Sequence, residues 1–142
     1  FVENKKPDLN NTYVKEFYSG YAAWNENVLI GGGIDSFYIN CAKTVFTCAS
    51  HPHNYYLEIL SELGILGFIL IMILFINTLW IIYNKNIFGK YTLQKQLTIP
   101  FVLLFLIEIF PIKTSGSFFT TGNASFIFFI LAVIISLSKR KI

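Results

Sequence analysis

The feature that most constrains this chain is an uncharged apolar stretch at residues 64–83, with the sequence GILGFILIMILFINTLWIIY. At about 1.5 Å per residue, a helix of this length spans about 30 Å, which is the thickness of the hydrocarbon core of a membrane. Only 13% of the residues are charged and 54% are hydrophobic, whereas about a quarter are charged in ordinary soluble domains. The stretch therefore predicts a transmembrane helix.

Two further apolar runs follow it. The first covers residues 97–112 and is short, with Pro100 near its start, where a missing N–H group costs little. The second covers residues 118–138 and ends at a basic Lys-Arg-Lys tail. Together the runs predict an all-α integral membrane protein, with a multi-spanning bundle of three transmembrane helices over residues 64–142. The remaining residues, 1–63, are predicted to form a loop region with amphipathic helices.

The distribution of charge predicts how these helices are oriented. Residues 1–63 carry four lysines against seven acidic residues, a net charge of −3, and residues 64–142 carry seven basic residues against one acidic residue, a net charge of +6. Cytoplasmic connections collect Lys and Arg. Three lysines lie in residues 84–96 and three basic residues follow Ser138. Both segments are therefore expected to be cytoplasmic, and residues 1–63 to lie on the opposite side.

Both cysteines of the chain, Cys41 and Cys48, lie in the segment expected outside the cytoplasm, with six residues between them. In an oxidising compartment a disulfide between them would stabilise this loop by roughly 2–3 kcal/mol. The alternatives are two unrelated thiols, or a zinc site, which the absence of Cys-x-x-Cys spacing disfavours.

The loop region itself begins with a predicted helix and a glycine turn. Aromatic side chains recur at helical spacing and predict a helix near the membrane surface that ends around residues 25–27; they are Tyr13, Phe17, Tyr21 and Trp24. Three glycines, Gly31 to Gly33, follow this helix. Their backbone N–H groups could approach a phosphate, although a flexible turn is the more frequent use of such a run.

A second amphipathic helix is predicted just before the first membrane span. Ser50 or His51 is expected to cap it, with Pro52 at its first position. This start places His53 and Asn54 in the first helical turn, directly outside the bilayer. An apolar stripe and an acidic face follow along the helix; they are Leu57, Leu60 and Leu63, and Glu58 and Glu62.

The run HPHNYYLEILSELGILGF resembles the histidine signature of the O-antigen ligase and O-antigen polymerase superfamily. In that signature a His-Asn pair precedes an aromatic residue, a Leu and then Glu-x-Gly before a membrane helix. The run GGGIDSFYINC resembles the Gly-x-Gly, Ser-Phe and Cys stretch of the same family, and CASHPHN its second cysteine. The resemblance covers about residues 20–70. Because three spans fall short of the family's membrane domain of about a dozen helices, we expect the C-terminal part of a longer protein.

The resemblance implies a metal-independent, inverting glycosyltransferase of the bacterial inner membrane that needs no cofactor. The donor would be a glycan on an undecaprenyl diphosphate carrier, and the acceptor a hydroxyl of lipid A-core or of a growing glycan. Residues 1–63 would then be periplasmic and the C-terminus cytoplasmic, among membrane lipids and with no nucleic acid as partner. The product would belong to lipopolysaccharide or another surface polysaccharide. Whether the chain is a ligase or a polymerase is left open.

The same resemblance assigns roles within the site. His53 would activate the acceptor hydroxyl, which suits an imidazole because it is largely neutral at pH 7 and can accept a proton. Asn54 would orient the ring or a sugar hydroxyl, and Glu62 matches the acidic position of the family. Gly31 and Gly33 belong to the stretch that would approach the donor.

One position departs from the family pattern. Family members carry an arginine, suited to a diphosphate, where this chain has Tyr38. The single arginine, Arg140, is predicted on the cytoplasmic side. The diphosphate would then meet Lys15, Lys43 or arginines upstream of the sequence, and we favour the last.

Two other interpretations compete with these roles. His51 and His53 as a metal pair have poor ligand spacing. A non-catalytic polysaccharide transporter or flippase subunit would make Glu108, inside the second apolar run, the functional residue, because a carboxylate in a membrane is costly unless it faces the bundle or lies near a helix end. The polar residues between 115 and 123 fit a sugar site and a plain turn equally well.

Overall fold

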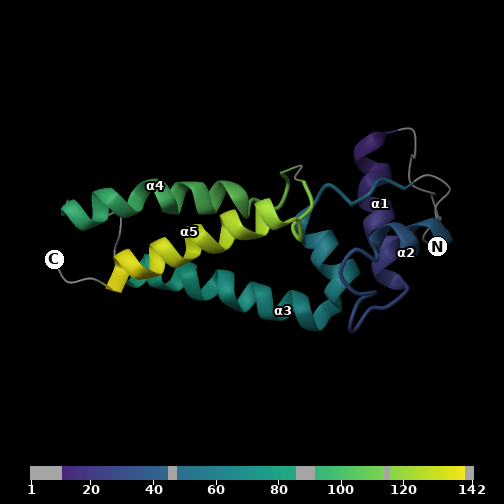
Figure 1. Ribbon diagram of the computed structural model, residues 1–142, viewed down its shortest axis with the longest axis horizontal. Helices are drawn as coiled ribbons and strands as arrows, with labels where there is room; N and C mark the ends of the chain where they lie inside the picture. The colour runs from purple at the N-terminus through teal and green to yellow at the C-terminus, as the bar shows by residue number, and fades with distance from the viewer. Residues whose placement is uncertain (1–10, 45–47, 86–91, 114–115, 140–142) are drawn as a thin grey trace, which may run out of the picture. The chain divides into compact units, whose positions relative to one another are not determined.

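The computed structural model describes residues 11–44, 48–85, 92–113 and 116–139. Within these ranges the chain forms helices and no strand (Figure 1). The helices are α1 (Thr12–Asn25), α2 (Phe37–Thr44), α3 (Tyr55–Asn84), α4 (Leu93–Glu108) and α5 (Thr121–Lys139). The all-α prediction is confirmed for this part of the chain.

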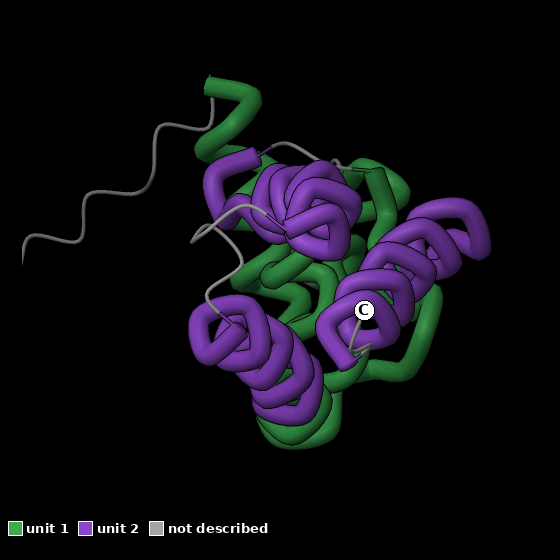
Figure 2. The backbone as a smooth tube through the Cα atoms, turned by 90° about the vertical axis from the view of Figure 1, so that its left-hand side faces the viewer, with its two compact units in different colours: residues 1–68, 114–118 green, residues 69–113, 119–142 purple. Residues whose placement is uncertain are grey.

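The chain divides into two compact units. Unit 1 comprises residues 1–68 and 114–118, and unit 2 comprises residues 69–113 and 119–142 (Figure 2). The division falls within α3, whereas the sequence predicted a boundary after residue 63. Unit 1 contains His53, Asn54 and the other residues assigned from the family resemblance, whereas Glu108 and most of the apolar helix length lie in unit 2.

In unit 2, α4 and α5 lie side by side (Figure 1). Phe75 of α3 meets Phe105 of α4 edge to face, with ring centroids 5.6 Å apart. Buried aliphatic side chains of α4 and α5 extend this core; they are Val102, Ile127, Ile130, Leu131 and Ile134. Large apolar side chains such as Leu70 and Trp80, by contrast, are 69% and 62% exposed, which is the pattern of helices that face lipid.

Two of the described helices are long and apolar enough to cross a membrane, α3 with 30 residues and α5 with 19. In α3 the backbone leaves the helical region at Gly64, where φ is 66° and ψ is −170°. The part beyond Gly64, residues 65–84, carries no charge and has the length of a membrane span. These two helices correspond to the first and third predicted spans.

The second predicted span differs from the helix that the structure shows. α4 has 16 residues, fewer than the about 20 that a perpendicular crossing needs. It begins at Leu93, because Thr92 caps it by accepting a hydrogen bond from the Lys95 N–H at 3.4 Å. Pro100 therefore lies inside the helix instead of near its start, and removes one hydrogen bond from its middle.

Glu108 is the last residue of α4 and not a mid-span charge. Its Oε1 lies 2.8 Å from Nζ of Lys113. Of the two placements considered for this acid, facing the bundle or lying near an end, the structure shows the position at a helix end. This position gives no particular support to the alternative function, a transporter or flippase subunit in which Glu108 would be the functional residue.

Candidate functional site

The face of α1 that packs inward consists of small residues, not of the aromatic residues that predicted the helix. Buried on it are Ser19, Gly20, Ala22 and Ala23. A Cβ atom on Gly20 would lie 2.9 Å from Cβ of Leu57 and 3.2 Å from Cβ of Pro52. The absence of a side chain at Gly20 thus lets α1 approach the start of α3 closely.

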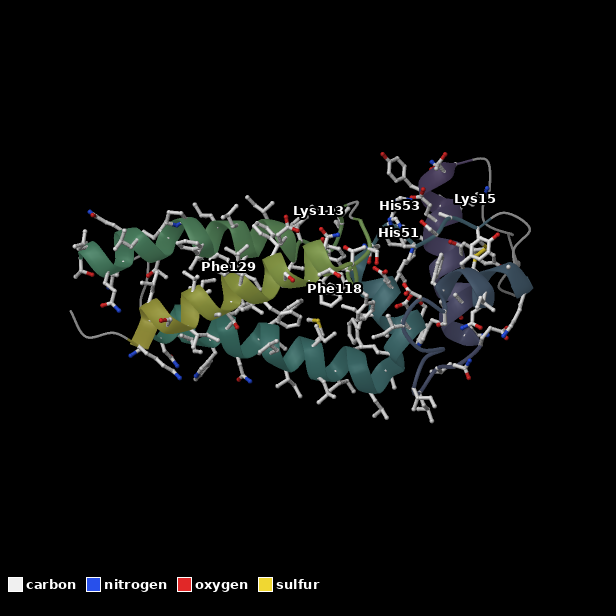
Figure 3. All side chains as sticks on the ribbon, viewed as in Figure 1. Lys15, His51, His53, Lys113, Phe118 and Phe129 are labelled. Atoms are coloured by element: carbon white, nitrogen blue, oxygen red, sulfur yellow. A yellow bond between two sulfur atoms is a disulfide. The ribbon has the colours of Figure 1, made fainter. Side chains whose placement is uncertain are left out.

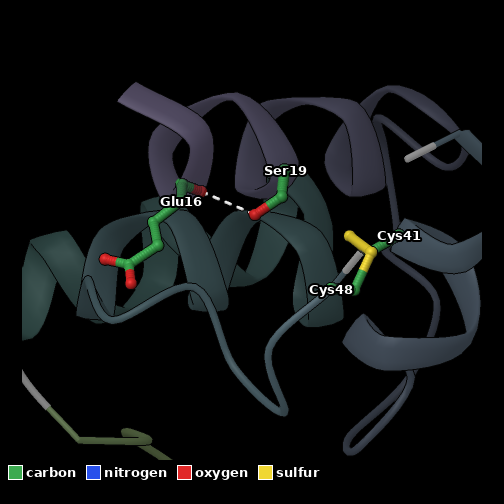
Figure 4. The surroundings of a disulfide bond; sticks show 4 residues. All are labelled: Glu16, Ser19, Cys41 and Cys48. Carbon is green, nitrogen blue, oxygen red and sulfur yellow. Dashed lines mark hydrogen bonds between the residues drawn. A yellow bond between two sulfur atoms is a disulfide. The ribbon is translucent and has the colours of Figure 1, made fainter. Parts of the chain in front are cut away.

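A disulfide links α2 to the segment that leads to the histidines. Sγ of Cys41 and Sγ of Cys48 are bonded at 1.97 Å, as the sequence predicted (Figure 4). Cys41 is fully buried, in a cluster with Ala23 of α1 and Phe37 of α2. The bond therefore fixes one end of the segment at residues 48–54 to the packed part of unit 1.

Asn54 fixes the other end of this segment by capping α3. Its side-chain Oδ1 accepts hydrogen bonds from the backbone N–H groups of Tyr56, at 3.0 Å, and Leu57, at 3.2 Å. The helix begins at Tyr55, so the expected start at Pro52 with a cap at Ser50 or His51 is wrong. Asn54 is only 4% exposed, and its side-chain oxygen serves the helix.

His53 directly precedes this cap and has a left-handed backbone, with φ of 51°. A positive φ is uncommon for residues other than glycine and tends to occur at functional positions. The imidazole lies beside that of His51, with ring centroids 4.2 Å apart (Figure 3). Its Nε2 lies 4.0 Å from Oε1 of Glu16 on α1. Among the described residues, neither ring nitrogen of His53 has a hydrogen-bond partner.

A hollow of about 420 Å³ opens at this histidine. Its walls are formed by Glu16, His53 and two neighbours on the first turn of α1, Thr12 and Tyr13. The volume lies within the range of about 300–1,000 Å³ that is usual for small-molecule sites. A partly exposed imidazole thus faces a space that a ligand can enter.

A smaller hollow of about 170 Å³ shares two of these walls, Thr12 and Glu16. Lys15 and Cys48 also line it. Lys15 is therefore the lysine that lines a space adjoining that of His53. Lys43 does not line either hollow, and its Nζ donates a hydrogen bond to Oδ1 of Asn40 at 3.0 Å.

His51 has a different environment from His53. Burial lowers the pKa of His51, and the neighbouring His53 lowers it further, while Glu16 acts in the opposite direction. Its Nδ1 lies 3.0 Å from Oγ of Ser50, and its Nε2 is buried with no hydrogen-bond partner in the described structure. The neutral form of the ring is therefore favoured, and the ring packs against that of His53.

The glycine turn packs against the backbone of α3 near its break. The N–H of Gly31 donates to the carbonyl of Asn27 at 2.9 Å, that of Gly32 to Ser61 at 3.0 Å, and that of Gly33 to Glu62 at 2.9 Å. The three N–H groups, which could have approached a phosphate, thus donate to backbone carbonyls in this structure. The glycines hold the loop against the helix, which agrees with the alternative that they form a turn.

Glu62, matched to the acidic position of the family, lies under this loop and away from both hollows. It is 3% exposed, and its carboxylate accepts hydrogen bonds from the backbone N–H groups of Asp35 and Phe37. Its Oε2 is nevertheless buried without a hydrogen-bond partner in the described structure. Burial raises the pKa of Glu62 to about 7. Its contacts make it an anchor for the start of α2.

Glu58 makes buried polar contacts that the sequence did not predict. It is 2% exposed; its Oε1 accepts a hydrogen bond from Oγ of Ser117, and its Oε2 accepts one from the N–H of Phe118, both at 2.5 Å. Burial raises the pKa of Glu58, although both hydrogen bonds act to lower it. Ser117, expected either to line a sugar site or to form a turn, binds this carboxylate. The acidic face of the helix is thus its buried face.

The resemblance noted in the sequence is confirmed by comparison with known families. Residues 3–72 match the family model described as O-antigen ligase. No curated protein matches the chain, and no solved structure matches it. The matched segment includes both hollows, the disulfide and the histidines, and residues 3–72 of this chain belong to the O-antigen ligase family.

Proposed function

We propose that this protein is an inverting, metal-independent glycosyltransferase that moves a glycan from an undecaprenyl diphosphate carrier to an acceptor sugar hydroxyl at the periplasmic face of the inner membrane. The proposal rests on the surroundings of His53. Its imidazole has no hydrogen-bond partner in the described structure and lines the hollow of about 420 Å³. The family match and the two apolar helices support a membrane enzyme of surface polysaccharide synthesis.

In the proposed reaction His53 acts as the general base. The acceptor oxygen attacks the anomeric carbon while its proton passes to a ring nitrogen of His53. The bond from the anomeric carbon to the diphosphate oxygen breaks, and the diphosphate leaves with the electron pair on its carrier. Because attack and departure occur on opposite faces, the anomeric configuration inverts. Proton transfer to a positioned base contributes about 10²- to 10⁴-fold to such a step.

The surrounding contacts support this role by fixing the histidine. The disulfide at Cys48 and the cap at Asn54 hold the two ends of its segment, and both belong to unit 1. A base that is held before the substrate arrives loses less entropy when the acceptor binds. Asn54 therefore contributes to catalysis by fixing the position of His53. We also propose that its side-chain amide contacts the sugar.

The negative diphosphate needs a cation. Of the two lysines considered from the sequence, Lys15 is the better placed because its hollow shares Thr12 and Glu16 with that of His53. We assign Lys15 to the diphosphate. A lipid A-core sugar or the end of a growing glycan remains the proposed acceptor.

Replacement of His53 tests the proposal. His53→Asn is the sharper variant, because Asn tolerates a left-handed backbone but its amide is not a proton acceptor at neutral pH. We expect it to lower glycan transfer by about 10²-fold or more with unchanged abundance in the membrane, as measured with lipid diphosphate-linked donor in proteoliposomes. His51→Phe, which keeps an aromatic ring beside His53, is the matched control and should retain activity. Normal transfer by His53→Asn would refute the catalytic role.

A further inference from the structure

We propose that Glu16 is a positioning residue for His53, with its carboxylate stabilising the imidazolium that forms when the acceptor loses its proton. The inference rests on the proposed function and adds a residue that the family resemblance did not supply. It is drawn from the distance of 4.0 Å between Oε1 of Glu16 and Nε2 of His53 and from the hollow that both side chains line.

The position of Glu16 is set by the packing of α1. Gly20 lies four residues further along the helix, so the two positions share a face. Gly20 is in close contact with Pro52 and Leu57, which lie on either side of His53 in sequence. This contact keeps Glu16 opposite His53, and the hydrogen bond from Ser19 Oγ to the Glu16 carbonyl, at 2.7 Å, adds a further constraint within the helix (Figure 4).

The Glu16 carboxylate is available for this role. Its side chain is 22% exposed, that of His53 is 37% exposed, and within the described structure neither carboxylate oxygen accepts a hydrogen bond. Glu58 also acts electrostatically on His53, but its two oxygens are bound by Ser117 and Phe118. Glu16 is thus the acid that lines the same hollow as His53, and its carboxylate can interact with a positive charge on the imidazole.

The chemistry gives the pair a role specific to the transition state. A general base begins the reaction in its unprotonated form, in which its attraction to a carboxylate is weak. As the acceptor O–H proton moves to His53, positive charge develops 4.0 Å from Glu16, and the carboxylate stabilises it while the diphosphate departs with its electrons. An interaction that strengthens only as charge develops raises kcat and leaves the acceptor KM nearly unchanged.

The test compares Glu16→Gln with Glu16→Asp in full-chain protein reconstituted with lipid diphosphate-linked donor. Gln keeps the size of the side chain and removes the charge, so we expect kcat to fall about tenfold or more, a part of what general base catalysis contributes, with an acceptor KM within about twofold of wild type. Asp keeps the charge and should recover part of the lost kcat. The matched control is Glu26→Gln, which removes an exposed acid at the end of the same helix.

The outcomes separate this inference from the proposed function. A wild-type kcat for Glu16→Gln, or an equal loss in Glu26→Gln, overturns the role of Glu16 while an inactive His53→Asn upholds the glycosyltransferase proposal. A loss in Glu16→Gln that Glu16→Asp does not recover at all also overturns it, because a charge effect would then be absent. Normal transfer by His53→Asn refutes the proposed function itself.

Discussion

Gly31 and Gly64 approach each other so closely that neither position has room for a side chain. A Cβ atom on Gly64 would lie 2.5 Å from the backbone nitrogen of Gly31, and a Cβ atom on Gly31 would lie 2.5 Å from the backbone nitrogen of Gly64. Both residues have positive φ, 69° and 66°. The glycine turn and the Glu-x-Gly segment, 33 positions apart in the sequence, therefore form one backbone-to-backbone contact.

We expect Gly64→Ala to destabilise unit 1. The new Cβ would meet the backbone carbonyl of Leu29 at 2.4 Å, and the backbone conformation there, with φ of 66° and ψ of −170°, alone costs about 1–3 kcal/mol in a residue with a side chain. Thermal unfolding of the purified protein in detergent measures the effect. The matched control is Gly122→Ala on α5, where a Cβ would meet nothing within 4 Å. Equal stability of Gly64→Ala and wild type would contradict the contact.

The carboxyl group of Glu62 should make stability depend on pH. Burial raises its pKa from 4.5 to about 7. Between these values the folded protein holds a proton that the unfolded chain has released, so the free energy of unfolding decreases as pH rises through this window. The contribution of protonated Glu62 to the free energy of unfolding is fully present below about pH 4.5 and lost above about pH 7. At 1.36 kcal/mol per pKa unit it amounts to about 3 kcal/mol.

Glu62→Gln removes this titration and should flatten the pH dependence. Unfolding measured at pH 5 and at pH 8 gives the comparison, with wild type losing more stability than Glu62→Gln on going to the higher pH. Glu26→Gln, an exposed acid of the same unit, should behave as wild type. An equally steep loss in Glu62→Gln would assign the pH dependence to other groups.

Much of the fold could be predicted from local sequence. The uncharged run after Gly64 and the apolar run before Lys139 correspond to the two helices long enough to cross a membrane, and the two cysteines to the disulfide. The predicted start of α3 was wrong because Ser50 and Asn54 are equally good caps by residue type. The structure shows the cap at Asn54, whose side-chain oxygen accepts hydrogen bonds from the N–H groups of Tyr56 and Leu57.

The candidate site was predicted in part. The histidine signature revealed His53, but Glu16 lies 37 positions earlier and nothing in its local sequence marks it as a partner. Glu58 and Ser117 are 59 positions apart, and their hydrogen bond is likewise a product of the tertiary structure. A periodic pattern shows that a helix has two faces, but it does not show which face is buried when both contain polar residues.

The disulfide should stabilise the histidine segment measurably. Closing a loop of this size contributes roughly 2–3 kcal/mol on the chain-entropy model, and the bond fixes Cys48 to the buried Cys41. Reduction should therefore lower the unfolding temperature and decrease glycan transfer. The variant with Cys41→Ala and Cys48→Ala should start from the lower stability and show no response to reductant. A response of that variant would mean that the reductant acts elsewhere.

The side of the membrane on which His53 lies decides whether any of the proposed chemistry is accessible to a periplasmic acceptor. Both native cysteines are bonded to each other, so one introduced thiol is the only free one. Glu26→Cys places it at the exposed end of α1, and Lys85→Cys at the exposed residue after α3. With a membrane-impermeant maleimide, Glu26→Cys should react in spheroplasts and Lys85→Cys only in inverted vesicles, because the basic connection is expected in the cytoplasm. The reverse pattern would place the imidazole in the cytosol, where a surface glycan is not the acceptor.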